Sequence, residues 1–164
     1  MEIIEASKDH ISVIQSLSDK IWPQTFHEIL TQEQITYMMD MMYSQSSLEK
    51  QLDNFHHYLL VEDEGEYLGY LSYELNYKAS NLTKVHKIYV LPSLQGKGVG
   101  RFLIEHAGRI AQANNNTELS LNVNRFNKAI DFYKKLGFEV ICSEDIDIGN
   151  GFLMQDYVMN KKLL

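Results

Sequence analysis

A glycine-rich segment, residues 92–101, constrains the fold of this chain more than any other feature. It follows an apolar, strand-like run that ends at Leu91, and it leads into a run of apolar residues with helical spacing. The glycines fall where that helix begins, at Gly96, Gly98 and Gly100. A strand, turn and helix of this kind leave backbone N–H groups bare at the positive end of the helix dipole, where phosphate binds. Lys97 and Arg101 add positive charge at the same place.

Two common phosphate-binding patterns do not fit this segment. The Walker pattern requires serine or threonine after Gly-Lys, and Gly98 stands at that position. The dinucleotide pattern G-x-G-x-x-G fails because Arg101 occupies the place of the last glycine. The pattern that does fit is Q-x-x-G-x-G, formed by Gln95, Gly98 and Gly100.

A second motif stands at residues 124–138, which read N-R-F-N-K-A-I-D-F-Y-K-K-L-G-F. Residues 128–136 have helical spacing, and Gly137 suits the left-handed conformation that ends many helices. The alternation of Leu119, Leu121 and Val123 predicts a strand between the two motifs. The chain is therefore expected to run strand, glycine turn, helix, strand, helix through this region.

The two motifs together resemble those of the GNAT superfamily of N-acetyltransferases. In that family a strand ending V-x-P precedes a pyrophosphate loop Q/R-x-x-G-x-G/A, matched here by Val90, Pro92 and residues 95–100. The second family pattern has an asparagine before an alanine, then an aromatic-tyrosine pair and L-G-F. Its matches are Asn127, Ala129, Phe132, Tyr133, Leu136, Gly137 and Phe138, with Asn124 as the alternative asparagine. The resemblance covers residues 66–138 well.

The resemblance implies acetyl-CoA as co-substrate and gives roles to individual positions. The backbone of Ile88 and Val90 would pair with the pantetheine arm, and Gln95 would shape the loop. The N–H groups of residues 96–101 would cradle the pyrophosphate, and Asn127 would hold the cofactor near its thioester. The expected cofactor-binding residues are Ile88, Tyr89, Val90, Gln95, Gly96, Lys97, Gly98, Val99, Gly100, Arg101, Asn127 and Tyr133.

The implied reaction is direct attack of an amine on the acetyl thioester, and it needs three functions from the protein. The family position of Tyr133 lies near the sulfur, and a phenol has a proton to give to the leaving thiolate. The backbone N–H of Val90 would stabilise the oxyanion. A base must take the amine proton, and His86, two residues before Ile88, would share a strand face with it and with Val90. Carboxylates are alternative bases, and the candidates are Glu28, Glu33 and Glu74.

The spacing of apolar residues along the chain changes between helical and strand-like periods, and it predicts one mixed α/β domain, residues 1–164. Helical spacing in residues 7–55 is followed by strand-like runs, and Asn150-Gly151 marks a final hairpin. Pro23 is expected to end or break the first helix. The expected fold is the GNAT acyltransferase fold, an α+β arrangement in which helices cover both faces of a central, mostly antiparallel mixed sheet.

Charge and cysteine content exclude several classes of function. The net charge of −7 disfavours nucleic acid as a partner and favours cationic small molecules. Cys142, the only cysteine, lies in an apolar run and is expected to pack in the core, which fits a reducing cytoplasm. No two histidines have helical ligand spacing, so no metal site is expected. No targeting or membrane-spanning segment is recognised, and cytoplasmic localisation is expected.

The N-terminal third is the region that would form the acceptor wall, and it resembles the PaiA-type polyamine acetyltransferases within the superfamily. The matching stretches are Thr25-Phe26, a helix with Tyr37, and the L-E-K-Q-L run at residues 48–52. A polyamine would suit the carboxylates of this region, Glu28, Glu33 and Asp40, although a solvated helix face explains them equally well. The alternatives are a protein acetyltransferase acting on N-termini or lysines, and a non-catalytic acyl-CoA-binding module. A homodimer is compatible with the family.

Overall fold

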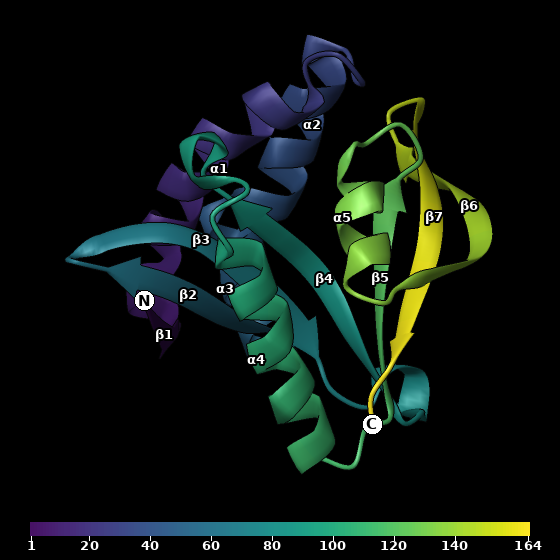
Figure 1. The fold of residues 1–164 in the computed structure, drawn as a ribbon. Coiled ribbons are helices and arrows are strands. Elements are labelled where there is room, and N and C mark those ends of the chain that lie inside the picture. The colour runs from purple at the N-terminus through teal and green to yellow at the C-terminus, as the bar shows by residue number, and fades with distance from the viewer.

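The computed structural model describes residues 1–164, and Figure 1 shows the course of the chain. The strands are β1 (Glu2–Glu5), β2 (His57–Asp63), β3 (Glu66–Glu74), β4 (Leu82–Val90), β5 (Glu118–Asn124), β6 (Glu139–Gly149) and β7 (Phe152–Lys162). The helices are α1 (Ile11–Phe26), α2 (Gln32–Tyr43), α3 (Gln45–Asp53), α4 (Val99–Ala113) and α5 (Ala129–Lys135). Short 3-10 turns stand at Lys8–His10, Tyr77–Ala79 and Pro92–Leu94.

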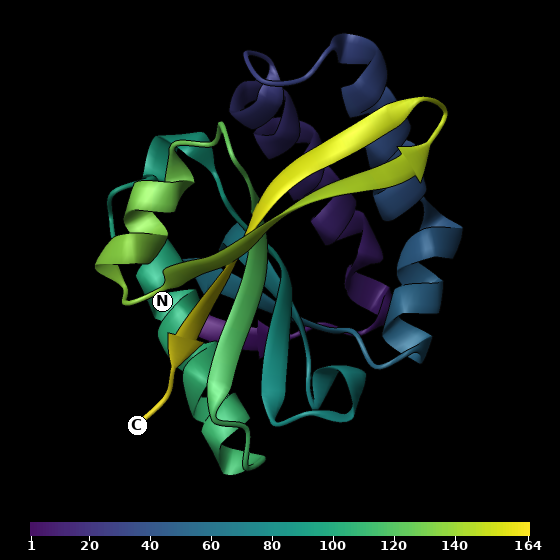
Figure 2. The same ribbon diagram turned by 90° about the vertical axis from the view of Figure 1, so that its right-hand side faces the viewer.

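The strands form one seven-stranded sheet in the order β1-β2-β3-β4-β5-β7-β6. Every neighbouring pair is antiparallel except β4 and β5, which run parallel. Figure 2 shows α1, α2 and α3 on one face of the sheet and α4 and α5 on the other. The expected fold class, a mostly antiparallel mixed sheet covered on both faces, is confirmed.

The sheet opens in its middle, between the two parallel strands. β4 and β5 are paired from Leu82 opposite Glu118 to Val85 opposite Leu121, and the pairing stops there. Beyond that point β4 continues beside β3, while β5 continues beside β7, and the two strands diverge (Figure 1). Strands that separate leave backbone groups and side chains facing a gap instead of a neighbouring strand.

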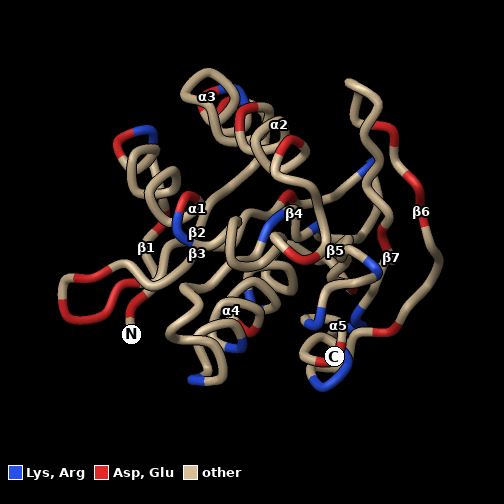
Figure 3. Tube along the Cα trace, turned by 90° about the horizontal axis from the view of Figure 1, so that it is seen from above, with Lys and Arg blue, Asp and Glu red and all other residues tan.

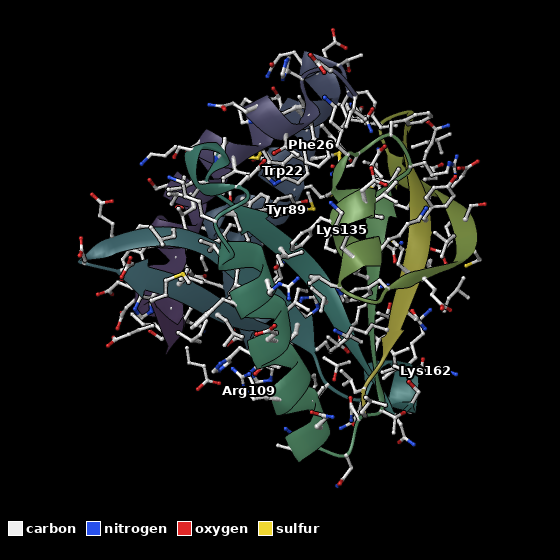
Figure 4. All side chains as sticks on the ribbon, viewed as in Figure 1. Trp22, Phe26, Tyr89, Arg109, Lys135 and Lys162 are labelled. Carbon is white, nitrogen blue, oxygen red and sulfur yellow. The ribbon has the colours of Figure 1, made fainter.

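A separate apolar core lies on each face of the sheet. One core lies under α4 and contains Leu103, Ile104 and Val85, with α5 contributing Tyr133. The other lies under α1, α2 and α3, and its members include Trp22, Ile14, Leu48, Tyr58 and Tyr70. Trp22, Phe26 and Tyr89 point toward one another between α1 and β4 in Figure 4, with ring centroids 4.4 to 6.3 Å apart. The core under α4 contains residues of both β4 and β5, such as Val85 and Leu121, and therefore holds the two strands together where they are paired.

Two sequence expectations are wrong, each for a packing reason. Pro23 does not end the first helix: α1 continues to Phe26, and His27 N–H donates to the Pro23 carbonyl at 3.1 Å. Trp22 and Phe26 are both buried, and burying two aromatic side chains offsets the cost of proline, about 3 kcal/mol. Cys142 is exposed because β6 is the edge strand of the sheet and lies outside both cores.

The surface charge is distributed unevenly. Figure 3 shows acidic positions on the turn between β2 and β3 and along β6, whereas basic positions gather on α5. No helix has the length and the apolar character that crossing a bilayer requires.

The core under α4 predicts a specific stability difference between two leucines. Substitution by alanine removes the same atoms from Leu103 and from Leu153. Leu103 is completely buried, whereas Leu153 is 48% exposed. Leu103→Ala is expected to lower the free energy of unfolding by about 2–5 kcal/mol because it leaves a cavity. Leu153→Ala, the control, is expected to change it by less than about 0.5 kcal/mol. Urea unfolding followed by circular dichroism measures both, and equal losses would contradict this account of the core.

Candidate active site

One cavity of about 840 Å³ fills the opening between β4 and β5. At one end it is lined by the glycine turn, with Gln95, Gly96, Gly98, Gly100 and Arg101. At the other end it is lined by apolar side chains of α1, α2 and β7, among them Phe26, Leu30, Met38 and Met154. The cavity passes from the α4 and α5 side of the sheet to the α1 and α2 side, so one continuous space joins two chemically different ends.

The glycine turn presents free backbone donors at the start of α4. Gly96 and Gly98 have φ angles of +81° and +85°, a conformation that other residues adopt only with strain. The first backbone N–H of this helix with a helical acceptor belongs to Phe102, which donates to the Gly98 carbonyl at 3.0 Å. The N–H groups of residues 98–101 therefore point out of the helix end unpaired. This end fits a phosphate group, which would accept these bonds and interact favourably with the helix dipole.

The expected cofactor residues of this turn do not all reach the cavity. Lys97 is exposed and lies outside the cavity lining, and the Val99 side chain is buried in the core under α4. Val99 can contribute there only through its backbone, and a role for the exposed Lys97 side chain stays a prediction. Gly100 is required for a different reason: a Cβ at this position would lie 2.9 Å from the ring of Phe132, so glycine lets α4 and α5 approach closely.

The end of β4 offers backbone groups to the cavity. Leu91 N–H donates to the Leu68 carbonyl on the β3 side at 3.0 Å. Backbone groups of successive residues point to opposite sides of a strand, so the N–H and C=O of Val90 point away from β3. Ile88 has the same orientation, and both residues line the cavity. The backbone of Ile88 and Val90 is therefore available to a ligand in the opening.

Tyr133 brings a phenol from α5 to the same cavity. Its residue is 7% exposed, and its ring packs against Phe132 and Phe138 with centroids 5.3 and 5.8 Å away. Burial raises the pKa of Tyr133 well above its ordinary value, so the hydroxyl keeps its proton at neutral pH. Tyr89, from β4, also lines the cavity. Burial is the main cause that raises the pKa of Tyr89, and the nearby phenols and Asp156 raise it further.

Both asparagines that match the second motif line the cavity. The side-chain carbonyl of Asn127 accepts a bond from the Ala129 N–H at 2.9 Å. That of Asn124 accepts a bond from the Phe126 N–H at 2.9 Å. The amide NH₂ group of each forms no hydrogen bond within the protein, so either asparagine can donate to a bound ligand.

His86 does not lie on the strand face that alternation predicts. Ser72 pairs with Lys87 and the next residue, Tyr73, pairs with Val85, so His86 is the extra residue of a β-bulge. The bulge shifts the alternation, and the His86 side chain lies on the α3 side of the sheet, opposite the side on which Ile88 packs. It still lines the cavity, at the point where the strands separate.

The partners of His86 form a compact polar cluster that the sequence did not reveal. Its Nε2 lies 2.9 Å from Glu74 Oε1, and its ring stacks on His56 with centroids 4.1 Å apart and planes 5° from parallel. Burial lowers the pKa of His86 to about 4, although the carboxylate of Glu74 opposes the decrease. His86 is therefore neutral at neutral pH and a weak proton acceptor.

The same three side chains bear on the expectation that no metal site is present. The ligand atoms of His56, Glu74 and His86 lie within 4.8 Å of one another although their positions are far apart in sequence. An imidazole nitrogen binds a metal ion in the plane of its ring. Two parallel stacked rings cannot both direct a lone pair at one ion, so this arrangement favours proton sharing over metal binding.

Lys87 and Asp156 also line the cavity, and sequence reasoning identified neither. The Lys87 ammonium donates to Tyr58 at 2.7 Å and Gln51 at 2.9 Å and lies 4.4 Å from the centroid of the Tyr43 ring. Burial lowers the pKa of Lys87 to about 7. Asp156 is 2% exposed, and burial raises the pKa of its carboxyl group. Polar residues on the terminal strands normally face solvent, so no sequence signal marked Asp156.

The carboxylates proposed for the acceptor wall separate into two groups. Glu28 lines the cavity from the end of α1, with its side chain 75% exposed at the rim. Glu33 and Asp40 are exposed on α2 and do not line the cavity. For these two the solvated helix face is the reading that the structure supports.

Comparison with known proteins agrees with this geometry. The acetyltransferase (GNAT) family model matches residues 16–138. The chain is 32% identical over 93 residues to the peptidyl-lysine N-acetyltransferase YjaB of Salmonella typhimurium, covering 55% of this chain and 54% of that one. It is 43% identical over 61 residues to YjaB of Escherichia coli, covering 37% and 38%. The chain thus matches about half the length, or less, of these relatives.

A solved structure with the same fold is the PaiA N-acetyltransferase of Thermoplasma acidophilum in complex with coenzyme A. The TM-score is 0.82 at 23% identity, over 98% of both chains. The family match covers most of the chain, and the chain therefore belongs to the GNAT acetyltransferases, a family of enzymes that use acetyl-CoA as the acetyl donor.

Lys87 predicts a pH dependence of stability. Its pKa is about 7 in the folded protein and near 10.4 in an unfolded chain, so the unfolded chain binds the extra proton between these values. The free energy of unfolding should therefore rise with pH in this window, by up to about 1.4 kcal/mol per pH unit. Lys87→Met should lose this contribution, and Lys162→Met, at an exposed position, should keep it. Urea unfolding from pH 7.5 to about 9.5 measures the slopes, and a Lys87→Met slope equal to that of the wild type would contradict the burial of a cation.

Proposed function

We propose that this protein transfers the acetyl group of acetyl-CoA to a primary amine of a small molecule, with polyamines as the leading acceptors. The observation that carries the proposal is the continuous cavity between β4 and β5, which joins the glycine turn to a second end lined by apolar side chains and by Asp156. A donor reaching in from one side and an acceptor entering from the other would meet where the strands diverge. Membership in the acetyltransferase family and the fold shared with PaiA support this choice.

The residues have distinct tasks in this proposal. The unpaired N–H groups of residues 98–101 bind the pyrophosphate, with Gln95 and Arg101 beside them. The outward backbone groups of Ile88 and Val90 pair with the pantetheine arm, and the amide of Asn127 or Asn124 binds the arm near the thioester. These contacts hold acetyl-CoA, which is the acetyl donor, in one orientation relative to the acceptor end of the cavity.

The chemical step is direct attack of the neutral amine on the thioester carbonyl carbon. A C–N bond forms, the C–S bond breaks, and the Val90 N–H stabilises the oxyanion. Tyr133 gives its proton to the departing thiolate and recovers one from the acetylated nitrogen through solvent. His86 was the base expected from the sequence, but its low pKa and its bond to Glu74 disfavour that role.

A protein-lysine acetyltransferase is the second candidate, and the names of the YjaB relatives favour it. The two candidates differ in the room that the acceptor needs. A lysine side chain must enter from a peptide that stays outside the cavity, whereas a free amine can be enclosed completely. Release of free CoA with a panel of polyamines, aminoglycosides, amino acids and lysine peptides decides between them.

The glycine turn predicts a selective loss of cofactor binding. Gly98 and Gly151 have similar φ angles, +85° and +78°, and a Cβ would meet nothing within 4 Å at either position. Substitution by alanine should therefore cost about 1–2 kcal/mol of backbone strain at each. Gly98→Ala should also disturb the donors at the start of α4 and raise the Kd for acetyl-CoA about 10-fold or more. Gly151→Ala is the control, and isothermal titration calorimetry gives both values. An unchanged Kd in Gly98→Ala would argue against this phosphate site.

Tyr133→Phe removes one hydroxyl and keeps the ring that packs against Phe132 and Phe138. If the phenol is the acid, kcat for acetyl transfer should fall about 100-fold while the Kd for acetyl-CoA stays nearly constant. Tyr157→Phe is the matched control. Tyr157 lies on β7 and does not line the cavity, so this variant should keep full activity. Wild-type kcat in Tyr133→Phe would remove Tyr133 as the acid and leave the transfer reaction itself intact.

A further inference from the structure

Asp156 is a buried carboxylate that no cation of the protein contacts directly. It lies on β7, is 2% exposed, and lines the cavity. None of the six ion pairs of the protein includes it. The one side-chain hydrogen bond to its carboxylate comes from Asn122 Nδ2 at 3.3 Å. A carboxylate has room for about four such bonds, so most of its capacity remains available inside the cavity.

The two neighbouring cations, Lys84 and Arg125, act on Asp156 through their charge, but neither contacts its carboxylate. Lys84 donates its ammonium proton to the side-chain carbonyl of Asn122. Arg125 forms an ion pair with Asp145 at 2.6 Å and reaches only the backbone carbonyl of Asp156, at 3.4 Å. Burial of a carboxylate without a paired cation is costly, and a bound cation would remove much of that cost.

A neighbouring carboxylate, that of Glu144, opposes the effect of these two cations on Asp156. Glu144, on β6, accepts a bond from the same Asn122 amide group at 3.2 Å. Two carboxylates therefore share one amide donor, and both carry negative charge toward this part of the molecule. Glu144 is one cause of the raised pKa of the Asp156 carboxyl, after burial itself.

Asp156 lies at the acceptor end of the cavity, away from the glycine turn. Along β7, Met154 packs against the core under α1 and α2, whereas Tyr157 packs against the core under α4. Alternation places Asp156 on the same face as Met154. On β5 the same division holds, because Leu121 and Val123 are buried under α4 while Asn122 reaches Asp156 on the other face.

We propose that Asp156 binds the ammonium group of the acceptor and takes its proton, and that the acceptor is therefore a primary alkylammonium ion. This inference rests on the proposed acetyl transfer and adds the residue that selects and activates the amine. The walls above Asp156 are apolar and fit an alkyl arm; they are Phe26, Ile29, Leu30, Met38, Met42 and Met154. An aliphatic polyamine and the side chain of lysine both present this chemistry.

The proton balance is complete without a further reactant. The ammonium gives one proton to the Asp156 carboxylate, and the neutral amine forms the C–N bond to the acetyl carbon while the C–S bond breaks. The sulfur takes its proton from Tyr133, which recovers one from the new amide nitrogen through solvent. Asp156 then returns its proton to solvent. The charged carboxylate attracts the ammonium electrostatically, whereas the neutral His86 offers it no charge.

The test compares Asp156→Asn with Asp40→Asn, which makes the same chemical change at an exposed position of α2 outside the cavity. Asp156→Asn keeps the shape of the residue and removes a buried charge, so the protein should fold; circular dichroism and the Kd for acetyl-CoA check this. The kcat/KM for an alkylamine should fall about 100-fold in Asp156→Asn while the KM for acetyl-CoA stays near its wild-type value. In the wild type, kcat/KM should fall at low pH as Asp156 becomes protonated, and this acid limb of the pH profile should be absent in Asp156→Asn. Asp40→Asn should match the wild type.

The outcomes separate the two levels of the proposal. Two acceptors are tested, spermidine and an Nα-acetylated lysine peptide. Acetyl transfer that depends on Asp156 supports the inference, and the acceptor that is acetylated identifies the source of the amine. Transfer that survives Asp156→Asn overturns this inference and leaves the acetyltransferase function standing. Loss of the acid limb in His86→Ala, with the limb retained in Asp156→Asn, overturns it as well. If the wild type acetylates no alkylamine, both the proposed function and the inference are overturned.

Discussion

The candidate site depends on one constraint, the end of the pairing between β4 and β5 after Val85 and Leu121. A sheet with every strand paired would place backbone bonds and side chains where the cavity now lies. Because each strand keeps a partner on its other side, β3 for β4 and β7 for β5, the separation costs few hydrogen bonds within the sheet. It also leaves the backbone of Ile88 and Val90 facing the opening.

The two cores keep this opening in shape and give its ends different chemistry. The core under α4 holds the glycine turn and Tyr133, so one end offers unpaired N–H donors and a protonated phenol. Beside the core under α1 and α2, the cavity is lined by apolar side chains and by Asp156. Positive dipole at one end and negative charge at the other would orient a phosphate-bearing donor and a cationic acceptor in opposite directions, which is the arrangement that transfer between them requires.

The β-bulge at His86 illustrates how a single extra residue changes a site. With uninterrupted alternation His86 would lie beside Ile88, on the side of α4. The bulge instead brings it to Glu74 and His56, on the same side as Lys87, which contacts Tyr58 and Gln51. Lys87 is buried and His86 is partly buried on that side, and desolvation lowers the pKa of each. A bulge depends on the register of the neighbouring strand, and the period of β4 alone does not contain that information.

Sequence patterns determined those parts of the molecule that depend on local conformation. The glycines at 96 and 98 adopt the left-handed backbone expected of a turn before a helix, and Gly137 does so after α5. The order of elements, the mixed sheet and the family also follow from patterns of a few consecutive residues, because turns and helix ends are set by their own side chains. The proline in α1 marks the limit of this reasoning, since packing of Trp22 and Phe26 overrides it.

Only the tertiary structure decided which distant residues meet. Asp156 reaches the cavity because β7 lies beside β5, and the cluster of His56, Glu74 and His86 joins a loop, β3 and a bulge. The exposure of Cys142 likewise follows from the position of β6 at the edge of the sheet. The physical reason is the same in each case: burial and charge pairing depend on neighbours brought together by strand order and register, and a single sequence records the side chains but not those neighbours.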